Sequence, residues 1–483
     1  MSHLAIDIGA GSGRIIRGEV RGNRIVLEEV HRFRNDTVRV DGHERWDVEA
    51  LFKEIMRGLR KAGRATSIGV DTWGVDFALM DSEGELLELP VSYRDPRTRG
   101  MDEHFLRIMS RERIYRKTGI QLMQFNTVFQ AFAVARRRSR ALKRAERLLM
   151  IPDYFNYRLT GRMCMEYTNA TTTQMLGART RAWDADILKS IPIDKKLLSP
   201  PIFPGDRIGT LLPELAAASG LGPVPVIAPA THDTGSAVAC VPALGTDWAF
   251  ISSGTWSLVG MELDRPVCTK RAMDFNFSNE GGVAGTYRFL KNVMGLWLIR
   301  GLNDSFSKKR SHSELMKLAA SARPFERFVD PDCADFLNPR CMRAAFDAYF
   351  DRTGQSRPKS DGEFARCALE SLALAYRRVL NQIHACVDRE IRRVQVIGGG
   401  SLNGLLNQMT ADAAGLPVYA GPVEGTAIGN VLVQAQAMGR IKSLEEGRAC
   451  VKRSFPVEKF VPRNTRAWDR AWEKFEAIVA EAR

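Results

Sequence analysis

Residues 7–14 read DIGAGSGR, and the pattern on either side of this turn decides the fold class. The apolar stretch 4–9 predicts a strand that runs into the glycines, the alternating stretch 14–20 predicts a strand that leaves them, and a third strand is predicted over 24–33. A dinucleotide-binding fold needs a GxGxxG turn that opens a helix. Here the glycines are spaced GxGxG and lead into a strand, and the chain has no GxxxxGKS/T motif. The stretch therefore predicts a β-meander and argues against both the Rossmann fold and the P-loop.

The turn at 9–13 is also a candidate phosphate site. Glycines let the backbone come close to a phosphate and point several N–H groups at it. Arg14 follows the turn and offers a guanidinium fork for phosphate oxygens. Asp7 precedes the turn and would repel phosphate unless a divalent cation lay between them. An ordinary hairpin turn with a surface aspartate is the structural alternative.

A second stretch, residues 228–239, reads APATHDTGSAVA and joins a predicted strand, 224–230, to small residues with helical spacing. The N-terminus of such a helix exposes backbone N–H groups and favours anions. Asp233 lies at this point, and it would act as a general base for a substrate hydroxyl within hydrogen-bond reach. The alternative is that Asp233 or Thr234 only caps the helix.

A third glycine break separates the predicted strands 67–71 and 75–80. Gly74 lies there between Trp73 and Asp76, and a tryptophan face beside a carboxylate is a common way to hold a sugar. A core tryptophan with a capping aspartate explains the same residues.

The strand–turn–strand pattern then recurs over 248–260, with Gly254 and Thr255 in the turn. Near the end of the chain, the glycine run 398–400 stands before a predicted helix over 403–414, where it would pass beneath an adenine or form a plain loop. Repetition of the first design in the second half of the chain indicates a duplicated architecture.

The composition narrows the class of protein. The chain has 483 residues, 45% hydrophobic and 26% charged, which indicates a globular protein of two or three domains. Without a membrane-length apolar run or a signal-peptide pattern, a cytoplasmic protein is expected. The eight cysteines form no CxxC pair, which disfavours a disulfide framework or a zinc site. The net charge of +14 would help to attract an anionic substrate, and the basic run 136–147 is interpreted as a solvated helix face rather than a nucleic-acid site.

Taken together, these stretches and others resemble the FGGY carbohydrate kinases, a family within the actin-like and hexokinase-like ATPase fold. The motifs span nearly all of residues 4–440. They are DIGAGSGR (7–14), GVDTWGVDFALMD (69–81), LPVSYRDPRT (89–98), PDYFNYRLTG (152–161), EYTNATTTQM (166–175), THDTGSAV (231–238), SSGTWSLVG (252–260), LKNVMGLWL (290–298) and GGGSLNGLLNQMTADAAG (398–415).

The resemblance implies an α/β fold of two actin-like, ribonuclease H-like domains, duplicated, with the active site in the interdomain cleft. It implies an N-terminal domain over 1–244 for sugar and phosphate binding and a C-terminal domain over 245–440 for nucleotide binding. A C-terminal tail would follow over 441–483, helical in part, with a possible helix over 465–482.

The resemblance also implies roles for single residues. Asp233 matches the family's base, which deprotonates the C1 hydroxyl of the sugar, and Asp7 matches the aspartate on the metal side. Arg300 departs from the family pattern, because relatives carry there an amide thought to contact the nucleotide. The implied ligand residues are Ala10, Gly11, Ser12, Gly13 and Arg14 for the ATP phosphates, Thr255 and Gly399 for the phosphate and adenosine ends of the nucleotide, and Gly74, His232, Asp233, Thr234 and Asn292 for the ketose.

Within the family, the motifs are most similar to those of members that phosphorylate L-rhamnulose at O1 in L-rhamnose catabolism. The implied partners are L-rhamnulose and ATP, with Mg²⁺, in a monomer or homodimer that binds neither nucleic acid nor membrane. One alternative is a kinase for L-fuculose, xylulose, ribulose or glycerol, which would differ in the pocket at 72–76, 232–234 and 292. The other is a non-enzymatic actin-like nucleotide switch, which would need no base at Asp233.

Overall fold

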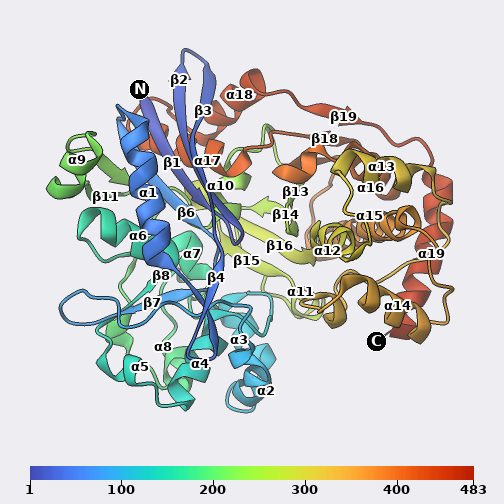
Figure 1. Ribbon diagram of the computed structural model, residues 1–483, viewed down its shortest axis with the longest axis horizontal. Helices are drawn as coiled ribbons and strands as arrows, with labels where there is room; N and C mark the ends of the chain where they lie inside the picture. The colour runs from blue at the N-terminus through green and yellow to red at the C-terminus, as the bar shows by residue number, and fades with distance from the viewer. Residues whose placement is uncertain (483) are drawn as a thin grey trace. The chain divides into compact units, whose positions relative to one another are not determined.

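A computed structural model describes residues 1–482, which form two compact units. Unit 1 comprises Met1–Leu244, Glu262–Phe289 and Gly425–Ser454. Unit 2 comprises Gly245–Met261, Leu290–Glu424 and the chain from Phe455 onward. Figure 1 shows the elements of both units. Each unit therefore combines separate stretches of the chain, whereas each of the predicted ranges 1–244, 245–440 and 441–483 is continuous.

Unit 1 is built on a six-stranded sheet with the order β11-β12-β6-β1-β2-β3. The first three strands of the chain form the predicted antiparallel meander, and β6 and β12 continue the sheet parallel to β1. The strands are β1 (Ser2–Ile8), β2 (Ser12–Arg21), β3 (Arg24–Arg34), β6 (Ser67–Thr72), β11 (Arg207–Thr210) and β12 (Pro225–Ile227).

Helices cover both faces of this sheet because the strands are apolar on both sides. Leu4, Ile6 and Ile8 pack in one core with α1 (Val48–Ala62), the blue helix that lies along the sheet in Figure 1. The alternate residue Ala5 faces the other way and packs with α17 (Gly425–Ala437). Residues 425–454 belong to unit 1 because α17 covers the sheet face that would otherwise be open.

The remaining elements of unit 1 include a second, mostly helical core around the antiparallel pair β7 and β8. The basic run 136–147 is not one helix face as predicted, because Arg138 has a φ of 50° and breaks it between α4 and α5. The elements are β4 (Thr37–Val40), β5 (His43–Trp46), β7 (Phe77–Met80), α2 (Met101–Leu106), α3 (Arg111–Thr118), α4 (Thr127–Arg136), α5 (Arg140–Arg144), β8 (Arg147–Met150), α6 (Ile151–Thr160), β9 (Met165–Glu166), α7 (Tyr167–Thr171), α8 (Ala185–Ser190), β10 (Pro201–Ile202), α9 (Pro213–Ser219), α10 (Asp233–Ala239), α11 (Lys270–Asp274) and α18 (Leu444–Ser454).

A second sheet has seven strands in the order β15-β16-β14-β13-β17-β18-β19. Its central order, β18-β17-β13-β14-β16, repeats the order β12-β6-β1-β2-β3 of unit 1, again with a parallel neighbour on one side of the first strand and an antiparallel neighbour on the other. The predicted duplication is confirmed. The strands are β13 (Trp248–Ser253), β14 (Trp256–Leu263), β15 (Ser278–Gly281), β16 (Tyr287–Met294), β17 (Arg393–Ile397), β18 (Val418–Ala420) and β19 (Glu458–Phe460).

The long helix α15 (Asp361–Cys386) is the most buried helix of unit 2 and packs against α16 (Gly404–Ala414). The helix predicted over 403–414 corresponds to α16, and the possible helix over 465–482 is α19 (Thr465–Ala482). The remaining helices are α12 (Trp297–Ser305), α13 (His312–Ser321) and α14 (Met342–Arg352).

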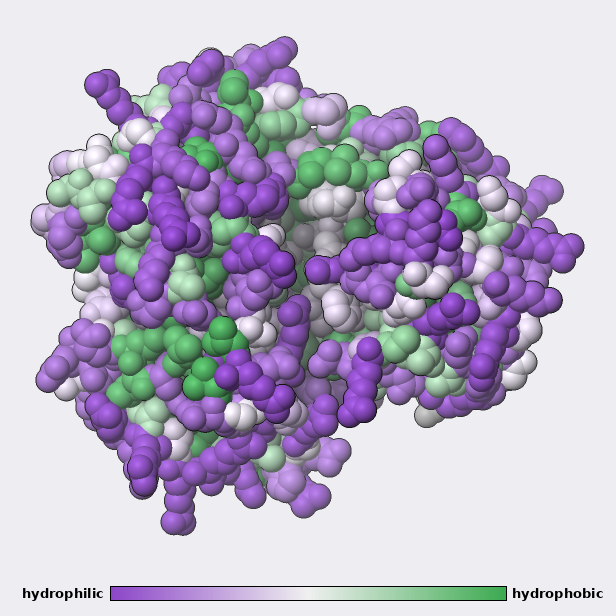
Figure 2. All heavy atoms as spheres, in the orientation of Figure 1, coloured by the Kyte–Doolittle hydropathy of each residue, from purple (hydrophilic) through white to green (hydrophobic). Residues whose placement is uncertain are grey.

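Hydrophilic side chains dominate the face shown in Figure 2, with hydrophobic residues in smaller patches among them. None of the helices within residues 1–482 is long and apolar enough to cross a membrane. All eight cysteines have free thiols.

Candidate active site

Three neighbouring strands of unit 1 bring acidic or polar residues to the same edge of the sheet, either within the strand or just after it. The strand β6 lies between β1 and β12 and is parallel to both, so the carboxyl ends of all three point the same way. Asp7 at the end of β1 pairs in register with Asp71 of β6. Thr72 then forms a parallel bridge with His232, and its N–H donates to the carbonyl of Thr231 at 2.9 Å. The fold thus collects Asp7 and the 231–234 segment, which are distant in sequence, at one edge.

Asp233 is the first residue of α10, and its side chain retains 30% of its exposure. The N–H of Thr234 donates to Oδ1 of Asp233 at 2.5 Å, and the hydroxyl of Thr234 donates to the same oxygen at 3.1 Å. Within residues 1–482, Oδ2 has no hydrogen-bond partner and remains available to a ligand. Burial, and then the charge of Asp7, raise the pKa of Asp233, although His232 and Thr234 oppose the shift. An accessible carboxylate oxygen with a raised pKa fits a general base.

Asp71 is a component of the site that sequence reasoning missed, because the motif at 69–81 was interpreted through Trp73 and Asp76. Its side chain is fully buried, and Oδ1 has no hydrogen-bond partner. The amide of Asn430 in α17 donates to Oδ2 at 2.5 Å. Burial and the nearby charge of Asp7 raise the pKa of Asp71 well above its usual range. The sequence does contain a signal for Asp71: it is an aspartate at the end of an otherwise apolar strand, and that strand lies beside the one that carries Asp7.

Asp7 is paired with Arg14 across the β1–β2 hairpin. Nε of Arg14 donates to Oδ2 of Asp7 at 2.9 Å, and a terminal nitrogen of the same guanidinium lies 2.9 Å from that oxygen. No group of three or more His, Cys, Asp and Glu side chains within residues 1–482 is arranged to hold a metal. However, Mg²⁺ in phosphoryl-transfer sites is held by one or two carboxylates together with water and phosphate. Asp7, the orphaned oxygen of Asp71 and Asp233 concentrate negative charge here, and that set fits a cation of this kind.

The glycine turn between β1 and β2 has the form expected of a phosphate-binding loop. Its ends are tied by a hydrogen bond from the N–H of Gly9 to the carbonyl of Ser12 at 2.9 Å, and Asn35 donates to the carbonyl of Gly9 at 2.9 Å. The backbone amides of Ala10 and Gly11 have no internal partner in the described chain, and Gly11 and Ser12 are exposed. Two unsatisfied N–H groups on an exposed turn can bind phosphate oxygens.

The turn after β6 is strained. Val75 has a φ of 68°, a region that β-branched residues avoid, and its N–H is held by the hydroxyl of Thr172 at 3.1 Å. A Cβ on Gly74 would lie 3.0 Å from Cγ2 of Thr172, so a larger residue would have to push Thr172 aside. Strain of this kind is retained where the surroundings enforce it, often at ligand sites.

Asp76 does not offer a free acceptor to a sugar, contrary to the expectation from its neighbourhood with Trp73. It is fully buried, and Oδ2 accepts from the indole N–H of Trp46 at 2.6 Å and of Trp73 at 3.0 Å. Oδ1 accepts from the amide of Gln130 at 2.9 Å. Since Trp73 is itself only 5% exposed, Asp76 anchors two tryptophans whose rings are in contact, with centroids 4.4 Å apart and planes tilted by 47°.

The segment that carries His232 is fixed by Glu166, which sequence reasoning also missed. Its buried carboxylate accepts from the N–H and hydroxyl of Thr231 at 3.0 and 2.7 Å and from the hydroxyl of Thr168 at 2.6 Å. Thr168 in turn accepts from the N–H of His232 at 3.2 Å. Burial raises the pKa of Glu166, while these donors oppose the shift. This network holds the polar segment in place before α10.

In unit 2, two glycine turns meet at the ends of the parallel neighbours β13 and β17. A Cβ on Gly400 would lie 1.9 Å from Oγ of Ser253, so the second turn packs directly against the end of β13. Gly399 has open space around it and is exposed, as is Thr255 in the first turn. The two predicted nucleotide residues of this unit therefore lie at adjacent strand ends.

Two further predicted positions also fall in unit 2. Asn292 is half-buried in β16. Arg300 is on α12, where its side chain is 72% exposed and lies 3.8 Å from the carboxylate of Asp304.

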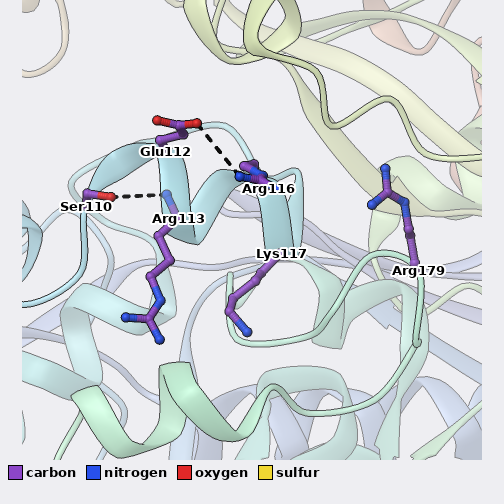
Figure 3. Close-up of a pocket in the computed structure, with 6 residues that line it drawn as sticks. All are labelled: Ser110, Glu112, Arg113, Arg116, Lys117 and Arg179. Atoms are coloured by element: carbon purple, nitrogen blue, oxygen red, sulfur yellow. Dashed lines mark hydrogen bonds and ion pairs between the residues drawn. The ribbon is translucent and has the colours of Figure 1, made fainter.

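A separate hollow of about 430 Å³ lies on α3. It is lined by Ser110, Glu112, Arg113, Arg116, Lys117 and Arg179 (Figure 3). Lys117 is already paired with Asp184 at 2.8 Å, and Arg113 with Asp186 at 3.2 Å. None of the predicted site residues lines this hollow.

Comparison with known proteins defines the class. The N-terminal domain model of the FGGY family of carbohydrate kinases matches residues 2–240, and its C-terminal domain model matches residues 249–438. The chain belongs to the FGGY family of carbohydrate kinases.

Among curated relatives, the protein named "Rhamnulokinase" from Bacteroides thetaiotaomicron is 45% identical over 480 residues, covering 99% of this chain and 99% of the relative. The "Rhamnulokinase" from Bacillus subtilis is 39% identical and covers 96% of each chain. Among solved structures, gluconate kinase from Lactobacillus acidophilus matches with a TM-score of 0.83 at 16% identity, over 100% of this chain and 99% of that chain. Xylulose kinase from the same organism matches with a TM-score of 0.82 at 15% identity, over 99% and 98%. The structural likeness confirms the two-domain α/β kinase fold.

Proposed function

We propose that this kinase transfers the γ-phosphoryl group of ATP to O1 of L-rhamnulose, giving L-rhamnulose 1-phosphate and ADP. The observation that carries the proposal is the position of Asp233: a carboxylate with an accessible oxygen, at the edge of the sheet where β1, β6 and β12 end. The full-length similarity to proteins named rhamnulokinase supports the choice of sugar.

In the proposed reaction, Oδ2 of Asp233 takes the proton of the O1 hydroxyl as O1 attacks the γ-phosphorus. The bond from the γ-phosphorus to the bridging oxygen breaks, and ADP leaves. A positioned general base of this type contributes about 10²- to 10⁴-fold. The raised pKa makes Asp233 a stronger base than an ordinary aspartate, provided that the pH stays above that pKa.

For ATP, we propose contacts from the turn Ala10–Arg14 to the phosphates, from Thr255 to the phosphate end and from Gly399 to the adenosine. The unpaired amides in the first turn support the phosphate assignment. The open space around Gly399 leaves room for a flat base against the backbone. Phosphoryl transfer depends mostly on such positioning and on charge neutralisation.

We propose Asp7 as the metal-side carboxylate for Mg²⁺, with Asp71 behind it. When bound, Mg²⁺ would neutralise charge on the transferred phosphoryl group. Arg14 already offsets part of the charge of Asp7.

For the ketose, we propose Gly74, His232, Asp233, Thr234 and Asn292 as contacts. The strained turn at Gly74 and the fixed segment at His232 are adjacent in unit 1, since Thr72 bridges to His232. We also propose that the enzyme works in the cytoplasm, as a monomer or homodimer.

The test is an ADP-release assay with MgATP over a panel of L-rhamnulose, L-fuculose, L-xylulose, L-ribulose and glycerol. One unmatched hydroxyl leaves a polar group unpaired, so we expect L-rhamnulose to lead by about 10- to 100-fold in kcat/KM. A faster rate with L-fuculose or a pentulose would overturn the sugar assignment while leaving the kinase class intact.

A further inference from the structure

A buried ion pair that the proposed reaction does not use lies directly behind His232. Arg288 of β16 is 0% exposed, and one of its terminal nitrogens lies 3.0 Å from Oε2 of Glu280 of β15, which is 4% exposed. Burying two charges has a desolvation cost that their attraction often fails to recover. The pair is therefore a poor source of stability, and its role must come from the residues that it contacts.

Both members of the pair contact the same ring nitrogen of His232. The second terminal nitrogen of Arg288 lies 3.2 Å from Nδ1, and Oε2 of Glu280 lies 3.2 Å from Nδ1. The other ring nitrogen, Nε2, lies 3.5 Å from Oδ1 of Asp233. Whichever tautomer is present, Nδ1 is directed to the ion pair and Nε2 to the proposed base.

The pair is rigidly seated. Nε of Arg288 donates to the carbonyl of Gly281 at 2.9 Å, and the hydroxyl of Ser278 donates to Oε1 of Glu280 at 3.1 Å. A Cβ on Gly235 would lie 3.6 Å from the guanidinium carbon, so Arg288 packs against the first turn of α10. The ion pair thus touches both the imidazole and the helix that begins with Asp233.

We propose that Glu280 and Arg288 are positioning residues for the ketose: they hold the imidazole of His232 so that Nε2 faces a sugar hydroxyl beside Asp233. This inference rests on the proposed function, because it takes His232 as a sugar contact. Neither residue touches the substrate in this role. Their effect is on sugar binding and not on ATP.

The first test uses Glu280→Gln and Arg288→Lys. Glu280→Gln keeps the size and one acceptor but removes the charge, and Arg288→Lys keeps the charge but loses the fork that reaches both partners. We expect KM for L-rhamnulose to rise about 10- to 100-fold, with KM for ATP within about twofold of the parent. The matched control is Glu262→Gln, which breaks another well-buried pair in unit 1, with Arg448 at 2.8 Å. This control should lower the melting temperature without moving either KM.

A second measurement does not depend on turnover. Nitrogen-15 NMR of the imidazole of His232 should give distinct Nδ1 and Nε2 shifts in the parent and an altered Nδ1 shift in Glu280→Gln. If a single substitution unfolds the chain, the double variant Glu280→Gln/Arg288→Met removes the unpaired charge and is measured in its place.

An unchanged sugar KM together with an unchanged Nδ1 signal would overturn the inference and leave the pair as a structural feature. If no sugar is phosphorylated, the proposed function fails by itself. The NMR result then still decides whether Glu280 and Arg288 orient His232.

Discussion

The ends of β1 and β6 in unit 1 carry Asp7 and Asp71, whereas β13 and β17, which hold the same places in the strand order of unit 2, lead into Ser253 and Gly398. In the first sheet, burial and the nearby charge of Asp7 raise the pKa values of Asp71 and Asp233. In the second, the corresponding strand ends carry the hydroxyl of Ser253 and the glycine backbone that packs against it. One topology thus places the proposed base and metal-side carboxylates in one unit and the proposed nucleotide contacts Thr255 and Gly399 in the other.

The glycines at the two sheet edges also differ in the space around them. Gly9 and Gly11 have room around them and belong to a turn with unpaired amides, which suits a charged ligand. Gly400 is needed because the neighbouring strand end leaves no space for a side chain, and Gly399 beside it stays open. Gly11 thus leaves the amides of the first turn accessible, whereas Gly400 permits close packing at the second sheet edge.

The largest effect is expected from Asp233→Asn, which keeps the shape of the proposed base and removes its basicity. We expect kcat to fall by about 10²-fold or more, with ATP and sugar binding retained. In the parent, the acid limb of the pH–rate profile should lie above the usual aspartate pKa of about 3.9, because burial raises the pKa of Asp233.

The control is Asp184→Asn at the N-cap of α8, where asparagine keeps the cap but loses the ion pair of Asp184 with Lys117 at 2.8 Å. It should cost stability and leave kcat unchanged. A parent-like kcat in Asp233→Asn would make Asp233 a cap of the same kind.

The next effect concerns the metal. Asp7→Asn should raise the Mg²⁺ concentration for half-maximal rate several-fold, because it removes the carboxylate proposed to orient the ion. Titration of Mg²⁺ at saturating ATP and sugar measures this half-maximal concentration. Asp247→Asn is the matched change in unit 2, since Asp247 pairs with Arg393 at 2.7 Å at the opposite ends of β13 and β17. Equal Mg²⁺ curves for the two variants would assign Asp7 a structural role only.

A pair of glycine substitutions tests the second sheet edge. Gly400→Ala places a methyl group 1.9 Å from Oγ of Ser253 and should destabilise the protein by about 1–3 kcal/mol through overpacking. Gly399→Ala meets no atom within 4 Å and should keep the melting temperature while raising KM for ATP. Thermal unfolding with ATP kinetics separates them, and a parent-like KM for ATP in Gly399→Ala would remove Gly399 from the nucleotide site.

The last expected effect concerns acid stability and leaves the activity aside. His3 is buried in β1 with its Nδ1 2.8 Å from Oγ of Ser67, and burial followed by the N-terminal charge lowers its pKa from 6.5 to about 4. As the pH falls from 6.5 to 4, the unfolded chain binds a proton that the folded chain refuses, so stability is lost. The shift corresponds to about 3 kcal/mol.

Denaturant unfolding at pH 6.5 and 4.5 should therefore show a smaller loss for His3→Asn than for the parent. Equal losses of stability in the two proteins would mean that the pKa of His3 is not lowered in the folded protein.

The sequence predicts the meander of β1, β2 and β3 and the position of Asp233 between a strand and a helix, because periodicity and glycine turns are local signals. The strand over 248–253 and the helix over 465–482 are reproduced to the residue. What the sequence did not reveal depends on distant partners. Asp71 becomes part of the candidate site only because Asp7 and Asn430 lie next to it in the fold. Asp76 is not free to bind a sugar, because it accepts a hydrogen bond from the indole N–H of Trp46.

The assignment of Gly425–Ser454 to unit 1 sets the order in which the protein can be completed during synthesis. A ribosome that has released only residues 1–244 has made a sheet whose face around Ala5 and Ile16 still lacks Val431 as its cover. Asp71 then also lacks Asn430 as its hydrogen-bond donor. A fragment cut at residue 244 should expose this face and aggregate, and the same fragment joined to 425–454 regains its missing helix. The first unit to begin folding is thus finished only after most of the second has been translated.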